Sequence, residues 1–151
     1  MKFSISLFLI LFSSIAIAQT ENPNFDAELA KKYVADDYGM KPYILVVLKT
    51  GTNTNQDKAF VNKCFSGHMA NIGKLVADNK LIVAGPMGKN DNGMRGIFIL
   101  DVPSIEKAKE LLKDDPAISE NLLLAEYYQW HGSAALPAYL ETSDKIWKKA
   151  P

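Results

Sequence analysis

The sequence of 151 residues is long enough for one globular domain with short extensions. Its residues are 48% hydrophobic and 23% charged, which is typical of a folded protein and excludes an intrinsically disordered chain. Lysine and arginine together number 17, as do aspartate and glutamate, and the lysines are scattered. This balance gives no sign of the basic surface that binds nucleic acid or an anionic membrane.

The first 18 residues differ in kind from the rest. One lysine precedes an apolar run from Phe3 to Ile17, which ends in small residues of the type that signal peptidase reads. A membrane span needs about 20 apolar residues, so this run is short for one. We therefore predict a signal peptide over residues 1–18, cleaved before Gln19, and an exported bacterial protein, periplasmic or secreted, without a membrane segment. An uncleaved anchor is the alternative.

Residues 19–40 predict an accessory helix ahead of the main domain. Asn24 is placed to cap it, Asp26 and Glu28 lie in a first turn where the helix dipole favours acids, and Gly39 ends it. Its apolar face consists of Phe25, Leu29, Tyr33 and Val34. We expect this face to pack on the domain or on a partner subunit.

A strand and a long helix follow. The run YILVVLK over residues 43–49 predicts a central strand, because aliphatic and β-branched runs are typical of strands covered on both faces. Thr54 and Asp57 then fit a capping box for a helix over residues 56–79. That helix carries an apolar stripe at i, i+4 spacing, which consists of Phe60, Cys64, His68, Ile72 and Val76. His68 is thus expected to face the buried side, and Cys64 to be a small buried hydrophobe.

The next two strands predict a β-hairpin. Residues 81–84 form the first, which Gly85 and Pro86 are expected to stop, and residues 96–102 form the second. Between them, residues 89–93 have strong turn chemistry, because Asn and Gly tolerate positive φ.

A second helix and a last strand complete the domain. Ser104 is placed to cap a helix whose apolar face consists of Ile105, Ala108, Leu111 and Leu112. Asp115 and Pro116 break it, since a residue before proline disfavours the helical conformation. Residues 122–130 predict the last strand. In the tail over residues 132–151, Ser143 is placed to cap a short helix, and Trp147 is expected to anchor it on the domain or across a dimer.

The predicted order βαββαβ is the split pattern of a ferredoxin-like α+β fold, with a four-stranded antiparallel sheet and both helices on one face. The other face of the sheet needs cover, and the last strand would expose Tyr127, Tyr128 or Trp130 there. We therefore expect a homodimer that buries the open faces of two sheets.

An ordered set of motifs over residues 41–131 resembles the YCII-related (YciI-like) family. The set consists of His68 in the first helix, Ala84-Gly85-Pro86, Gly96, Asp114-Asp115-Pro116 and Trp130. The resemblance implies a dimeric α/β barrel, and it implies that His68 and Asp115 form the active-site pair. Such a carboxylate would fix the imidazole tautomer and raise its basicity, which leaves the other nitrogen as a general base or acid.

Each member of that pair also has a structural interpretation. His68 could be an ordinary hydrogen-bonded helix histidine, and Asp115 could cap a short turn that has Pro116 at its first position. Asp114 competes with Asp115, and the Asp-Pro register favours the latter. Near the hairpin, Gly85 and Pro86 are expected to shape a pocket wall, with Met87 and Arg95 as specificity residues.

Other chemistries are poorly supported. Cys64 and His68 are four residues apart, as metal ligands are on some helices, but no further histidine or cysteine lies at ligand spacing. The glycines are too dispersed for a phosphate loop, so we expect neither a metal nor a cofactor. Two hypotheses remain: a cofactor-independent, isomerase- or lyase-like enzyme acting on a small molecule through His68 and Asp115, or a non-catalytic periplasmic ligand-binding or structural dimer module. A preorganised His68 in a cleft would favour the enzyme.

Overall fold

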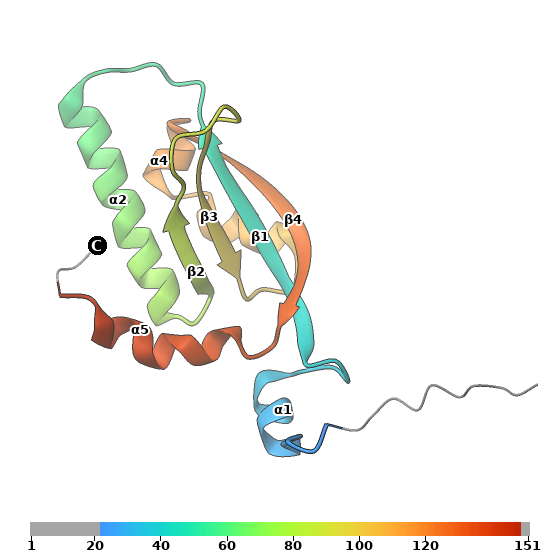
Figure 1. Cartoon of the computed structure of the whole chain (residues 1–151). Coiled ribbons are helices and arrows are strands. Elements are labelled where there is room, and N and C mark those ends of the chain that lie inside the picture. Colours follow the sequence, from blue (N-terminus) through green and yellow to red (C-terminus); the bar gives the residue numbers. More distant parts are fainter. Residues whose placement is uncertain (1–21, 149–151) are drawn as a thin grey trace, which may run out of the picture.

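The protein, as a computed structural model of the chain, is described over residues 22–148, and the predicted signal peptide lies outside this range. Its strands are β1 (Met40–Thr50), β2 (Leu81–Pro86), β3 (Met94–Leu100) and β4 (Leu123–Ser133). They form one sheet in the order β2-β3-β1-β4, in which all neighbours are antiparallel (Figure 1). This arrangement confirms the ferredoxin-like α+β fold.

The main core lies between one face of the sheet and three helices, α2 (Lys58–Ala77), α3 (Ile105–Leu112) and α4 (Pro116–Ser119). Alternate side chains of β1 point into it, and Ile44, Val46 and Leu48 are all buried. The helices contribute Leu75, Ala108, Leu112 and Ala117 to the same cluster. Cys64 is buried, as predicted. No helix among residues 22–148 is long and apolar enough to cross a membrane.

The helix starts show which polar residues cap them. Ser104 caps α3 as predicted, because its hydroxyl accepts from the Lys107 backbone N–H at 3.2 Å. The predicted capping box with Thr54 is wrong: Asp57 itself is the cap of α2 and accepts from the Ala59 N–H at 3.0 Å. The capping residue is thus the last Asx before the helix rather than the first candidate in the loop.

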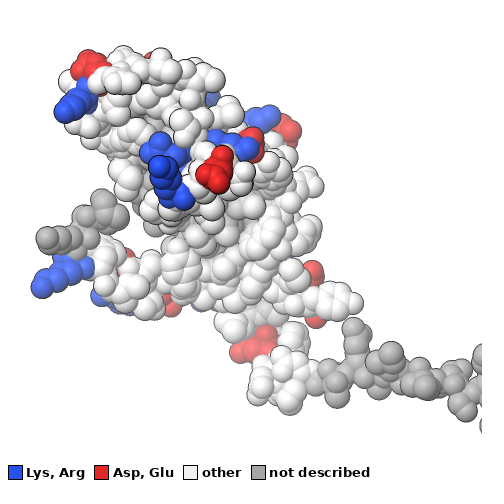
Figure 2. Space-filling view, turned by 45° about the horizontal axis from the view of Figure 1, so that its top comes forward, with Lys and Arg blue, Asp and Glu red and all other residues white. Residues whose placement is uncertain are grey.

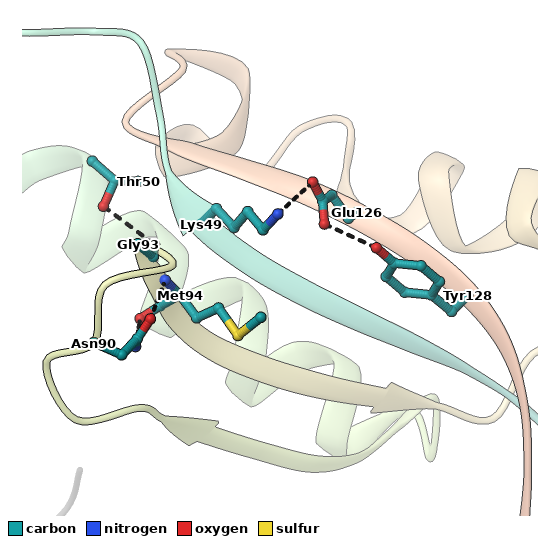
Figure 3. A network of polar contacts seen from close by, with 7 residues as sticks. All are labelled: Lys49, Thr50, Asn90, Gly93, Met94, Glu126 and Tyr128. Carbon is teal, nitrogen blue, oxygen red and sulfur yellow. Dashed lines mark hydrogen bonds and ion pairs between the residues drawn. The ribbon is translucent and has the colours of Figure 1, made fainter.

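The hairpin is longer than predicted. β2 does not end at Ala84 but includes Gly85 and ends at Pro86, and the Met87 N–H adds one further bond to the ladder by donating to the Arg95 carbonyl at 2.8 Å. Pro86 is tolerated because β2 is an edge strand. Asn90 holds the predicted turn through Nδ2, which donates to the Met94 carbonyl at 2.8 Å (Figure 3).

The C-terminal segment covers one end of the opposite, open face of the sheet. A second apolar cluster forms there around Tyr43, Ile82 and Ile99, with Leu136 and Leu140 of the tail packed against it. These two residues belong to the 3₁₀ helix η1 (Leu136–Tyr139) and to α5 (Leu140–Ile146).

The expected tail contacts are different in the structure. Ser143 lies inside α5 and donates to the Leu140 carbonyl at 3.2 Å, so the predicted cap is wrong. Trp147 is 52% exposed within this chain. The Tyr139 hydroxyl, which donates to the Ile82 carbonyl, anchors the segment instead. Contact of Trp147 across a dimer stays a prediction.

The N-terminal helix α1 (Ala27–Tyr33) lies at the edge of the molecule (Figure 1). Its cap is Asp26, which accepts from the Leu29 N–H at 2.9 Å, and not Asn24. The helix ends at Tyr33 and is capped by Val34, which has a left-handed backbone, while Gly39 serves the turn into β1. The residues of α1 are all at least partly exposed, so its apolar face does not pack firmly on this domain. Packing on a partner subunit stays a prediction.

Candidate active site

His68 and Asp115 lie in direct contact between two helices. His68 projects from the middle of α2, and Asp115 is the N-cap residue directly before α4. The His68 Nδ1 is 2.8 Å from the Asp115 Oδ2. His68 is 7% exposed and Asp115 is 0% exposed. Because both side chains are buried, solvent screens the attraction between them very little.

Asp115 divides its two oxygens between a structural task and the histidine. Its Oδ1 caps α4 by accepting from the Ala117 N–H at 3.1 Å, with Pro116 at the first helical position. Its Oδ2 faces His68 and also accepts from the Asn71 Nδ2 at 3.1 Å. Asp115 therefore both caps α4 and pairs with His68, so the two interpretations of this residue are compatible.

These contacts keep Asp115 ionised. Burial alone would raise the pKa of the Asp115 carboxyl, but the hydrogen bonds that it accepts from His68, Asn71 and Ala117 outweigh that effect. The net result is a pKa below its usual value. At neutral pH, the side chain is a carboxylate that can only accept hydrogen bonds.

An acceptor-only carboxylate assigns the tautomer of His68. Nδ1 must carry the proton that it donates to Asp115, so a neutral His68 ring holds its lone pair on Nε2. Among the described residues, every buried side-chain nitrogen or oxygen has a hydrogen-bond partner. Nε2 has none in that part of the chain, so it retains contact with solvent. His68 therefore presents an available basic nitrogen.

Two aromatic side chains hold the ring of His68. Phe98 stacks on it with ring centroids 5.7 Å apart and an interplanar angle of 23°, and Phe65 meets it edge-on at 6.2 Å and 84°. Together with the hydrogen bond to Asp115, these contacts fix both the position and the rotation of the imidazole. Such fixed geometry is what a general base needs.

His68 lines a cavity of about 410 Å³ between α2 and the hairpin of β2 and β3. Known small-molecule sites span roughly 300–1,000 Å³, so the volume suits a small ligand. Of the pocket residues that the sequence suggests, Gly85, Pro86 and Arg95 line the cavity, while Met87 lies outside the lining. The other lining residues are Leu48, Phe65, Met69, Ile72, Ala84, Gly96, Phe98 and Leu123.

Asn71 also belongs to the site, although no motif in the sequence points to it. It lies three residues after His68, which places both side chains on one face of α2. An asparagine has a low helix propensity, so its presence inside a 20-residue helix is the signal that could have marked it. Among the described residues, no three side chains of His, Cys, Asp or Glu gather as metal ligands would.

Fold and site together define a ferredoxin-like α+β protein with a buried histidine–carboxylate pair beside an apolar cavity. Residues 45–131, more than half of the chain, match the YCII-related domain. The chain belongs to the YCII-related domain family. It matches no curated protein.

The solved structures that are similar to this chain include the 5-chloro-2-hydroxyhydroquinone dehydrochlorinase from Burkholderia phenoliruptrix AC1100, in complex with 2,5-dihydroxybenzoquinone. The match has a TM-score of 0.42 and 19% identity, and it covers 58% of this chain and 92% of the other.

Proposed function

We propose that this protein is a cofactor-independent enzyme that transfers a proton on a small molecule, with His68 as the general base. The observation that supports this proposal is the 2.8 Å contact of Nδ1 with the Asp115 carboxylate, beside a cavity that the same ring lines. A histidine packed without solvent contact, or one free in water, would favour a binding module. His68 is neither.

The proton transfer follows from the site. Nε2 takes a proton from an acidic C–H or O–H of the bound molecule, and the imidazolium that forms keeps its Nδ1–H on Asp115. The negative carboxylate lies against this cation and stabilises it as the proton is transferred. Return of the proton to another atom of the substrate gives an isomerase, and departure of a leaving group gives a lyase.

The test is exchange of hydrogen for deuterium at the activated C–H of 2-indanone and acetophenone in D2O, followed by proton NMR. We expect the protein to accelerate exchange, and His68→Gln to lose about 10²- to 10⁴-fold of that acceleration. The matched control is His131→Gln, because His131 is the other histidine and is exposed on β4. If His68→Gln still accelerates the exchange as the wild type does, His68 is not the general base.

We also propose that two copies pack through the open faces of their sheets. The outward-facing side chains of β1, β3 and β4 include Leu45, Val47, Ile97, Leu124 and Tyr128. Leu124 is 49% exposed and Tyr128 is 48% exposed, so this chain alone leaves large side chains of the face uncovered. The molecular surface has a broad area without charged side chains (Figure 2).

A polar network lies on the same open face. The Lys49 Nζ is 2.8 Å from the Glu126 Oε1, and the Tyr128 hydroxyl donates to the Glu126 Oε2 at 2.9 Å (Figure 3). These groups satisfy one another, so a second copy could cover them without leaving an unpaired charge.

A charge in the middle of this face should separate the two copies. Val47 lies between Ile97 of β3 and Glu126 of β4, and we expect Val47→Lys to convert a dimer to a monomer in sedimentation velocity. The control is Val76→Lys, which makes the same change on α2, where Val76 is 37% exposed. A wild-type protein that sediments as a monomer at micromolar concentration would exclude this dimer.

A further inference from the structure

The lining of the cavity is apolar except at two places. The helix α2 contributes Phe65, Met69 and Ile72, and the hairpin contributes Ala84, Gly85 and Gly96, which present little side-chain bulk. A Cβ on Gly96 would lie 2.8 Å from the Gly85 carbonyl oxygen, so β3 has no room for a side chain at this position. An aromatic ring on one side and bare backbone on the other form a wall suited to a flat apolar molecule.

The two polar side chains of the lining suit an acidic hydroxyl and the anion that it leaves after it loses its proton. His68 presents Nε2, and Arg95 supplies a permanent positive charge from the exposed part of β3. Among the described residues, Arg95 takes part in no ion pair, and none of the lining residues is acidic. Asp115, the carboxylate paired with His68, lies on the Nδ1 side of the ring rather than on the Nε2 side. A cationic ligand would therefore meet only positive or neutral groups.

We propose that the cavity binds a compact, mainly apolar ring compound with one weakly acidic hydroxyl, a phenol or an enol, which it holds as the anion beside Arg95. This inference rests on the proposed function. The O–H bond of the ligand breaks, its proton forms a bond to the His68 Nε2, and the electron pair stays on the ligand oxygen. The resulting anion faces the Arg95 guanidinium, and the imidazolium is neutralised by Asp115.

The probe is 4-nitrophenol, whose absorption spectrum distinguishes the phenol from the phenolate. At a pH where the free probe is mainly protonated, we expect titration with the protein to produce the phenolate spectrum. Nitrobenzene, which has the same ring without the hydroxyl, should bind more weakly, and so should 4-nitrobenzylamine, which is a cation. The affinity of each of the three compounds is measured by letting them compete with one another for the protein. Chemical-shift changes of the Met69 methyl group report binding in the cavity, because Met69 lines it.

Arg95→Gln is expected to weaken the binding of 4-nitrophenol by about 10- to 150-fold, because a hydrogen bond to a charged group contributes about 1.5–3 kcal/mol. The binding of nitrobenzene should not change. The matched control is Lys89→Gln, which removes a positive charge from the same hairpin outside the cavity lining. Arg95 is exposed, so its replacement should leave the fold intact.

The outcomes separate this inference from the function that it extends. The proposed ligand class is wrong if the phenolate forms in a His68-dependent way while Arg95→Gln has no effect, or if the cationic probe binds as tightly as 4-nitrophenol. In either case His68 can still be the general base. If 4-nitrophenol binds in an Arg95-dependent way as the neutral phenol, the proton transfer is wrong. If neither 4-nitrophenol nor nitrobenzene perturbs Met69, the cavity does not take this class of compound.

Discussion

Asp115→Ala is expected to lower the free energy of unfolding by about 3–5 kcal/mol, the range typical of breaking a buried charged contact. Three donors lose their acceptor at once: the His68 Nδ1, the Asn71 Nδ2 and the Ala117 N–H. The last of these is also the cap of α4, and loss of a cap alone costs about 1 kcal/mol. Urea unfolding followed by circular dichroism measures the change.

Asp115→Asn is the matched variant, because it keeps the shape and one oxygen that can cap α4. Its effect should depend on pH. The folded-state pKa of Asp115 is lowered, so the carboxylate stabilises the fold above its ordinary value of 3.8 and loses that contribution as pH falls through the lowered value. The stability difference between the wild type and Asp115→Asn should thus shrink in acid. A difference that stays constant down to the acid limit would contradict the lowered pKa.

The fold follows from local signals in the sequence. Continuous aliphatic runs predicted β1, and turn residues around Asn90 predicted the hairpin. His68 could be placed on the buried face of α2 because helical spacing alone puts it in the stripe of Cys64 and Ile72. Helical spacing alone does not predict the role of its partner Asp115. The Asp-Pro sequence indicates a helix start, and the family resemblance indicates the pairing with His68.

What the sequence could not provide depends on contacts between distant segments. Asn71 enters the site because α4 brings Asp115 beside α2, and local spacing does not predict that approach. The choice of helix caps was also ambiguous, since several Asx, Ser and Thr residues lie within a few positions of each start. The actual cap is set by where the chain turns toward its tertiary contacts.

The approach of α2 to α4 depends on a glycine. Gly67 precedes His68, and Pro116 follows Asp115, so these two residues flank the paired side chains. A Cβ on Gly67 would lie 2.6 Å from the Pro116 Cγ, which is closer than real Cβ atoms come. Since the proline ring has little freedom to move away, α2 and α4 would have to separate at the site itself.

Gly67→Ala is therefore expected to destabilise the protein by about 1–3 kcal/mol, as overpacking does, although alanine is the better helix former by about 1 kcal/mol. Gly73→Ala is the control on the same helix: nothing lies within 4 Å of its added Cβ, so it should stabilise by about 0.5–1 kcal/mol. Urea unfolding gives both values, and the ¹⁵N shifts of His68 report whether Nδ1 still donates its proton. If Gly67→Ala gains stability as Gly73→Ala does, the two helices can hold the pair without their close approach. If it loses stability and the His68 signal changes with it, the contact between Gly67 and Pro116 is what sets the distance of the imidazole from its carboxylate.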